Sequence, residues 1–171
     1  MYHTPAPAPQ QASLFPLADT RPARPYRLPI YRVMLVRDAS LTLEQPQIRS
    51  SRDAAVLFRQ HLGAVDREHF LVAMLDQKNK VIGINTVSIG SLTASVVHPR
   101  EVMKPAILSN AAALVCGHNH PSGAPHPSQE DRALTKRLVD AGQLLGIKVL
   151  DHIIIGDGSE AYFSFADEGV L

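Results

Sequence analysis

The sequence has only one cysteine, Cys116, and it has no long apolar run. A single cysteine excludes an internal disulfide and suits a reducing compartment, so we expect a cytoplasmic protein. It also excludes the zinc deaminases, whose signature needs the two cysteines of P-C-x-x-C. A transmembrane helix needs about 18 consecutive apolar residues, and a signal peptide needs a charged start before an apolar stretch. Neither pattern is present, so no membrane association is expected.

The net charge of +1 conceals an uneven distribution of charge. Up to Arg52 the chain has seven arginines and three acidic residues, a net charge of +4, which leaves −3 for the remainder. Because residues 1–27 are also rich in proline and alanine, we predict a disordered basic arm there. Residues 28–171 then form one domain, with its core in residues 50–171. The arm is interpreted as a solvated tail, since few aromatic residues accompany its charges. Weak contact with DNA is the alternative.

Short apolar or β-branched runs predict the strands of the domain. Residues 70–75 form a continuous apolar run, as expected of a strand that is buried on both faces. The other predicted strands, in chain order, are residues 28–36, 81–89, 93–97, 113–117, 147–155 and 161–165. Combined with the helices below, they predict an α/β sandwich with a central mixed, largely antiparallel sheet flanked by helices.

Capping signals and helical spacing predict three helices between these strands. Ser51 is expected to cap the first helix. Pro99 suits the first turn of the second helix, which should break near Lys104, because Pro105 removes a hydrogen bond and clashes with the preceding turn. Ser128 is expected to cap the third helix, whose leucines recur at helical spacing.

The most informative segment begins at His118 and ends at Asp131. His118 and His120 are separated by one residue, so on a strand both side chains point to the same face of the sheet. Two imidazoles and the carboxylate of Asp131 make a three-ligand set that leaves one position open on a tetrahedral Zn²⁺. Water at such a position ionises near neutral pH and becomes a nucleophile. The segment therefore predicts a catalytic zinc site.

The spacing of these residues adds specificity. After His120 come seven residues, then Ser128, two more residues and Asp131, which resembles the motif of the JAB/MPN metallopeptidase family, also called JAMM. That motif includes a glutamate ahead of an apolar strand, and Glu68 stands at the matching place. Further segments resemble the RadC-like branch of the family: residues 97–102, 110–113, 118–123 and 151–156.

This resemblance, which covers the core of the predicted domain, implies both a fold and an activity. The implied fold is the cytidine-deaminase-like α/β sandwich of JAB/MPN proteins. The implied activity is zinc-dependent hydrolysis of peptide or isopeptide bonds in an unidentified protein or peptide substrate. By the same resemblance, the metal ligands are His118, His120 and Asp131. Glu68 is implied as general base and then general acid, and Ser128 as the group that stabilises the oxyanion.

Several of these residues also have a purely structural interpretation. Ser128 and Asp131 match a capping box, in which the acid bonds back to the cap backbone. We favour metal binding for Asp131, because Ser128 can cap the helix by itself. Glu68 is otherwise a solvent-facing charge at the end of a strand. Asp151 and His152 are either outer partners of the metal ligands or hydrogen-bonding groups at a strand edge.

Two other functional classes compete with a zinc hydrolase. RadC-like proteins carry a DNA-repair label, so a DNA-associated role in repair or mobile-element biology is the second hypothesis. The third is a JAB/MPN scaffold without catalysis, which the intact ligand set argues against. His126 lies between His120 and Ser128 but is not a residue of the motif, and it is expected to be exposed. Cys116, which precedes the two histidines, is expected to lie in the core.

Overall fold

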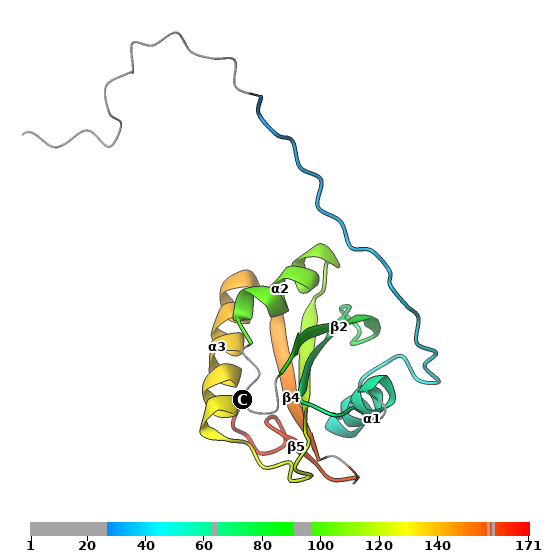
Figure 1. Ribbon diagram of the computed structural model, residues 1–171, viewed down its shortest axis with the longest axis vertical. Helices are drawn as coiled ribbons and strands as arrows, with labels where there is room; N and C mark the ends of the chain where they lie inside the picture. Colours follow the sequence, from blue (N-terminus) through cyan, green and yellow to red (C-terminus); the bar gives the residue numbers. More distant parts are fainter. Residues whose placement is uncertain (1–26, 63–64, 91–96, 157, 159) are drawn as a thin grey trace, which may run out of the picture. The chain divides into compact units, whose positions relative to one another are not determined.

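The computed structural model describes residues 27–62, 65–90, 97–156, 158 and 160–171. The chain divides into two units, residues 1–32 and residues 33–171. In the first unit, the described residues 27–32 are extended and exposed. The rest of the predicted basic arm, residues 1–26, lies outside the described part of the chain. The helices and strands described below all belong to the second unit (Figure 1).

The described strands form one sheet with the order β2-β1-β3-β4-β5. Their bounds are β1 His69–Leu75, β2 Val81–Ile89, β3 Ala113–His120, β4 Lys148–Gly156 and β5 Tyr162–Ser164. Only β3 and β4 pair in parallel, and the other three neighbouring pairs in this sheet are antiparallel. The prediction of a mixed, largely antiparallel sheet is therefore confirmed.

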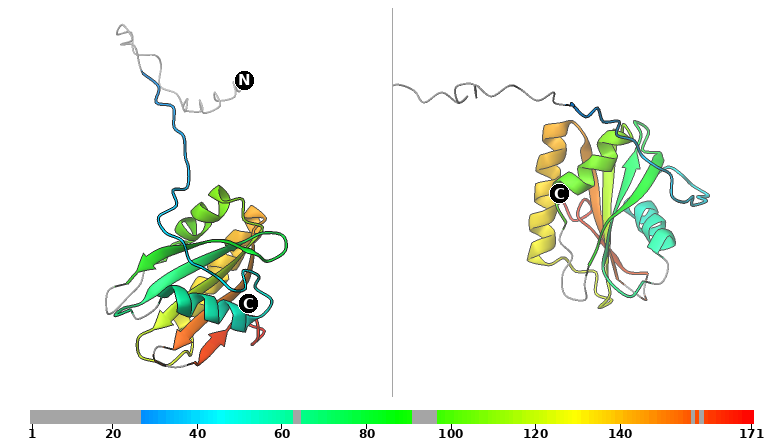
Figure 2. Two further views of the ribbon diagram at one scale, coloured as in Figure 1. Left: turned by 90° about the vertical axis from the view of Figure 1, so that its right-hand side faces the viewer. Right: turned by 45° about the horizontal axis from the view of Figure 1, so that its top comes forward.

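Helices cover both faces of the sheet, as Figures 1 and 2 show. Their bounds are α1 Ser51–Leu62, α2 Pro99–Leu108 and α3 Gln129–Leu145. Alternate residues of β1 pack on opposite sides: Phe70 belongs to the core beneath α2 and α3, whereas Leu71 belongs to the core beneath α1. This confirms the α/β sandwich and the burial of β1 on both faces. In the described residues, no helix is both long and apolar enough to cross a bilayer.

A close approach between α1 and β3 fixes the strand just before the two histidines. Gly117 has no side chain, and a Cβ at this position would lie 2.5 Å from the ring of Phe58. Phe58 is fully buried in the core beneath α1, so it has little room to move aside. Overpacking of this kind typically costs about 1–3 kcal/mol. Glycine at this position therefore allows α1 to pack directly on the strand that carries the candidate ligands.

Two of the predicted strands are not observed as expected. Residues 28–36 are described, but they form no strand, and Ile30 and Val36 are 94% and 81% exposed. The prediction was wrong because apolar, β-branched side chains favour extended backbone but do not supply a neighbouring strand to pair with. The predicted strand at residues 93–97 falls mostly on residues 91–96, which lie outside the described part of the chain.

Two details of the predicted helices were also wrong. The cap of α1 is Ser50, not Ser51: its Oγ accepts a hydrogen bond from the backbone of Asp53 at 3.3 Å. The helix α2 does not break at Lys104 but continues through Pro105. Pro105 is buried, and the packing of this side of α2 on the sheet outweighs the cost of about 3 kcal/mol that an internal proline imposes.

Candidate metal centre

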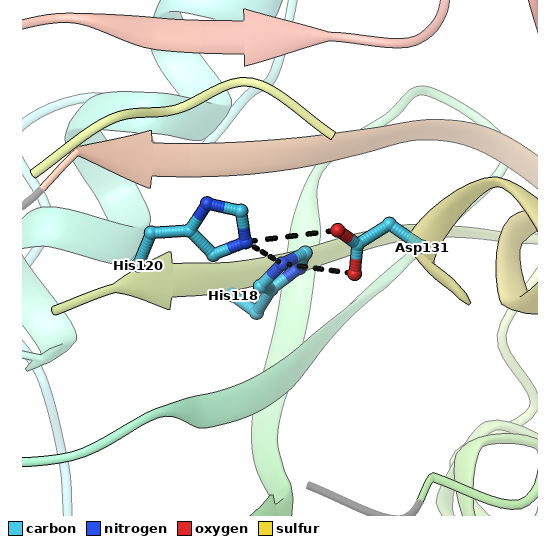
Figure 3. Close-up of side chains that lie close together, drawn as sticks. All are labelled: His118, His120 and Asp131. Atoms are coloured by element: carbon cyan, nitrogen blue, oxygen red, sulfur yellow. Dashed lines mark hydrogen bonds and ion pairs between the residues drawn. The ribbon is translucent and has the colours of Figure 1, made fainter. Parts of the chain in front are cut away.

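The end of β3 carries the two histidines of the motif toward the start of α3. His118 and His120 are two residues apart on this strand, and their side chains lie on the face that α3 covers. Asp131 is in the first turn of α3 and faces both imidazoles (Figure 3). His118 is almost fully buried, and the side chains of His120 and Asp131 are 19% and 14% exposed. The three residues therefore converge at one partly sheltered point.

The distances between the three side chains suit a tetrahedral metal ion. Nε2 of His118 lies 3.0 Å from Nε2 of His120 and 3.3 Å from Oδ1 of Asp131. Nε2 of His120 lies 3.6 Å from Oδ2 of Asp131. Ligand atoms about 2.0–2.1 Å from a tetrahedral Zn²⁺ stand about 3.3 Å apart. The residues thus fit the group that the motif implies, in atom type and in spacing.

His120 is held in the orientation that metal binding requires. Its Nδ1 lies 2.8 Å from the carbonyl oxygen of Ala124, and because a carbonyl only accepts, Nδ1 must carry a proton. In the neutral ring the other nitrogen, Nε2, then offers a lone pair toward Asp131. A ligand histidine typically has its second nitrogen fixed in this way.

The capping box and the candidate metal site share Asp131. Oδ2 of Asp131 accepts hydrogen bonds from the backbone N–H and the hydroxyl of Ser128, at 2.8 and 2.7 Å. The Ser128 hydroxyl oxygen in turn accepts from the N–H of Asp131 at 3.1 Å. The expectation that Asp131 leaves the box to serve a metal is therefore corrected, since the box is complete. Both roles are compatible because a carboxylate has several lone pairs, and Oδ1 is the oxygen nearest to His118.

The charges around the site favour a cation. Burial lowers the pKa of His118 to about 4, so its ring is neutral at neutral pH. The hydrogen bond that His120 donates to the carboxylate of Asp131 raises the pKa of His120 above its ordinary value. Burial pushes the pKa of Asp131 upward, but its hydrogen bonds with His120 and Ser128 hold it well below the ordinary value. The carboxylate therefore stays ionised, and a proton on His120 is what a metal must displace.

Glu68 lies beside this centre, immediately before β1. Phe70 pairs with His118 across β1 and β3, and extending this antiparallel register by two residues sets Glu68 opposite His120. Burial raises the pKa of Glu68, the charge of Asp131 raises it further, and His120 lowers it. Glu68 is thus close enough to interact electrostatically with two of the candidate ligands, without belonging to the three-residue cluster.

The residue between the two histidines holds the backbone around Glu68. Oδ1 of Asn119 accepts from the N–H of His69 at 2.8 Å, and its Nδ2 donates to the carbonyl of Arg67 at 3.1 Å. The carbonyl of Glu68 itself accepts from the N–H of Gly90 at 2.8 Å. The peptide units on both sides of Glu68 are therefore fixed, which limits the positions its carboxylate can reach.

Asp151 and His152, the two candidate outer partners of the metal ligands, have different roles in the structure. Nε2 of His152 lies 2.9 Å from Nδ1 of His118, so His152 contacts a candidate ligand directly. The carboxylate of Asp151 accepts hydrogen bonds from the N–H groups of His152 and Ala166 and from the hydroxyl of Ser164, at 2.7, 3.0 and 2.6 Å. These bonds tie β4 to the chain that follows it, so Asp151 has the structural role.

Other residues lie as the sequence predicts, and two functional contacts were missed. Cys116 is buried in the core, where burial raises the pKa of its thiol to about 12, and His126 is exposed. The roles of Asn119 and of Thr135, whose hydroxyl lies 2.6 Å from His152, were not anticipated. The position of Thr135, one turn after Asp131 on the buried face of α3, is the signal that was available.

Comparison with known proteins is consistent with this geometry. The family of the RadC-like JAB domain matches residues 48–170. Proteins named UPF0758 protein from Rubrobacter xylanophilus and Moorella thermoacetica are 50% and 54% identical, over 74% and 71% of this chain and 55% and 53% of their own lengths. A relative of the same type from Caldanaerobacter subterraneus is 55% identical over 67% of this chain and 49% of its own. The chain thus spans about half the length of these relatives. It belongs to the RadC-like JAB domain family.

Proposed function

We propose that this protein is a zinc-dependent hydrolase that cleaves peptide or isopeptide bonds. The observation that supports the proposal most directly is the triangle formed by His118, His120 and Asp131, with sides of 3.0, 3.3 and 3.6 Å. A Zn²⁺ ion held by these three residues would supply Lewis-acid chemistry: it would polarise the scissile carbonyl and make water a nucleophile at neutral pH. Three protein ligands leave the fourth tetrahedral position for such chemistry, whereas a purely structural zinc site is closed by four.

Glu68 is the proposed proton carrier of the reaction. Its carboxylate accepts a proton from the attacking water and then gives it to the leaving amine. A carboxylate with an ordinary pKa holds a proton too weakly for the second half of this task. Burial and the nearby charge of Asp131 raise the pKa of Glu68, which brings it closer to neutral pH and improves both transfers.

Ser128 is the proposed donor to the oxyanion that forms on the substrate. Its hydroxyl proton is directed at Oδ2 of Asp131 in the structure, so it must turn away from that oxygen to reach a substrate. The accepting bond from the N–H of Asp131 can persist during this rotation, because a hydroxyl accepts and donates through different sites. Ser128 can therefore cap α3 and assist the reaction in the same cycle.

The proposal is tested by hydrolysis with and without zinc. The full chain is treated with a chelator, dialysed and assayed on a panel of peptide and isopeptide-linked substrates, before and after one equivalent of Zn²⁺ is returned. We expect cleavage only in the zinc-restored sample. Cleavage that survives the chelator would identify another mechanism or a contaminating protease. A zinc-loaded protein that cleaves no member of the panel would count against peptide and isopeptide hydrolysis.

Zinc affinity is expected to fall as the pH drops through the raised pKa of His120. Its hydrogen bond with Asp131 raises this pKa above 6.5, so below it a proton competes with the metal, and above it none does. His118 titrates only at about 4. Between the two pKa values, the logarithm of the association constant should therefore fall by about one unit per pH unit. Competition titrations between about pH 5 and pH 8 measure the slope, and an affinity independent of pH would contradict the ligand assignment.

A further inference from the structure

A line of buried hydrogen bonds connects α3 to the candidate ligand His118. The hydroxyl of Thr135 lies 2.6 Å from Nδ1 of His152 on β4, and Nε2 of His152 lies 2.9 Å from Nδ1 of His118 on β3. Thr135, His152 and His118 are 2%, 0% and 1% exposed. Because water has almost no access to these groups, their protons must be shared among themselves.

The direction of the first bond follows from the other contact of Thr135. Its Oγ1 also lies 2.6 Å from the carbonyl oxygen of Asp131. Two oxygens at this distance repel unless a proton lies between them, and the carbonyl has none to give. The single hydroxyl proton of Thr135 is therefore directed at Asp131. Toward His152 the hydroxyl can only accept, so Nδ1 of His152 carries a proton.

The second bond is then determined by the first. The ring of His152 is fully buried, and its two nitrogens contact neutral groups, the hydroxyl of Thr135 and the ring of His118. Such surroundings disfavour a charged ring, so it is neutral and has a proton on one nitrogen only. With Nδ1 protonated, Nε2 of His152 is an acceptor. Nδ1 of His118 must donate to it, which leaves Nε2 of His118 as a bare lone pair. This is the nitrogen that lies 3.3 Å from Oδ1 of Asp131.

Aromatic packing holds each of the two histidine rings in the orientation that these hydrogen bonds require. Phe70 stacks on His118 with the ring planes 14° apart, and Phe165 stacks on His152 with the planes 12° apart. Both phenylalanines are 1% exposed. A ring flip, which would exchange the two nitrogens, must displace a fully packed neighbour. The direction of each hydrogen bond in this line is therefore fixed by the packing of the rings as well as by the number of protons available.

We propose that Thr135, acting through His152, is a positioning residue that sets the tautomer of His118 in which Nε2 is free to bind a cation. This inference rests on the proposed zinc site, and it assigns to that site a residue on the second turn of α3. In the opposite tautomer a proton on Nε2 of His118 is directed at Asp131 and occupies the place of the metal. Of the groups on the Thr135 side chain, only the hydroxyl contacts His152 through a hydrogen bond, so the hydroxyl carries the tautomer preference.

The test compares Thr135→Val, which keeps the shape and removes the hydroxyl, with Thr135→Ser, which keeps the hydroxyl. Histidine ring nitrogens of the metal-free full chain are observed by ¹⁵N NMR, which distinguishes the two tautomers directly. We expect His118 to be protonated at Nδ1 in the natural protein and in Thr135→Ser. In Thr135→Val, Nδ1 of His152 loses its acceptor, and the Nε2-protonated forms of His152 and His118 become populated.

Zinc affinity is measured on the same samples by competition with a chromophoric chelator. We expect Thr135→Val to weaken Zn²⁺ binding by about 10- to 100-fold, the usual effect of losing an outer partner of a ligand. Thr135→Ser should stay within about twofold of the natural protein, well below that range. If Thr135→Val does not fold, as judged by its melting curve, His152→Phe removes the same relay with an apolar ring.

The possible results separate the inference from the proposed function. The inference is overturned, whatever the zinc data show, if the tautomer of His118 is unchanged in a folded Thr135→Val. If Thr135→Val does not fold, the same outcome in His152→Phe overturns it. A changed tautomer with unchanged zinc affinity overturns it too, because the relay then does not serve the metal. If the natural protein binds no zinc but shows the expected tautomers, the proposed function fails while the hydrogen-bond order stands.

Discussion

Replacing His120 with alanine should remove the zinc from the purified protein and, with it, all hydrolysis. The natural chain is expected to hold about one Zn²⁺, bound by two imidazoles and one carboxylate. Without Nε2 of His120, only His118 and Asp131 remain, and two ligands do not retain Zn²⁺ through dialysis. Because His120 is partly exposed and lies at the end of β3, its truncation should leave the core intact. Elemental analysis of dialysed protein, with a melting curve on the same sample, measures both effects.

The matched control is His126→Ala, in the segment between β3 and α3. His126 is exposed and does not belong to the cluster formed by His118, His120 and Asp131. This variant should keep its zinc and its activity, which separates loss of a ligand from loss of any histidine near the site. Equal zinc in the natural protein and in His120→Ala would show that the metal, if present, is bound elsewhere.

The candidate ligands could be predicted from sequence because they come from one short segment with a fixed geometry. Strand alternation places His118 and His120 on one face, and the next element of the chain is the capped helix that carries Asp131. The local chain therefore determines most of the triangle before any tertiary contact is known. The same holds for β1, whose unbroken apolar run directly predicts burial on both faces.

Other features depend on contacts between distant segments, which local patterns do not contain. The relay from Thr135 to His118 requires that α3 cover the face where β3 and β4 run side by side. The helical spacing of α3 marks Thr135 as a buried residue, but it does not identify the strand residue that its hydroxyl contacts. Pro105 shows the converse, since a strong local signal for a helix break is overridden by packing. For residues 28–36, apolar character alone predicted a strand, although pairing depends on a partner that composition does not specify.

Changing Glu68 to glutamine should lower the rate of hydrolysis severely while leaving the zinc in place. Glutamine has nearly the same shape, so the backbone bonds that Asn119 makes on either side of Glu68 should survive. An amide, however, can neither accept the proton of the attacking water nor return it to the leaving amine. Loss of one general acid–base group typically lowers the rate by about 10² to 10⁴. Zinc content comes from elemental analysis, and the rate from the zinc-restored hydrolysis assay.

Glu130→Gln provides the matched control, because Glu130 is an exposed carboxylate in the same turn of α3 as Asp131. It should retain both zinc and activity. A folded Glu68→Gln without zinc would make Glu68 a ligand and refute the assignment of roles.

The pH profile gives a further check on the mechanism. Since burial raises the pKa of Glu68, the proposed activity of the natural protein should fall as the pH drops through that raised value and the base becomes protonated. Glutamine does not titrate, so the residual activity of Glu68→Gln should not show this fall at low pH. A fall in activity that is caused by loss of zinc at low pH should instead remain in both proteins.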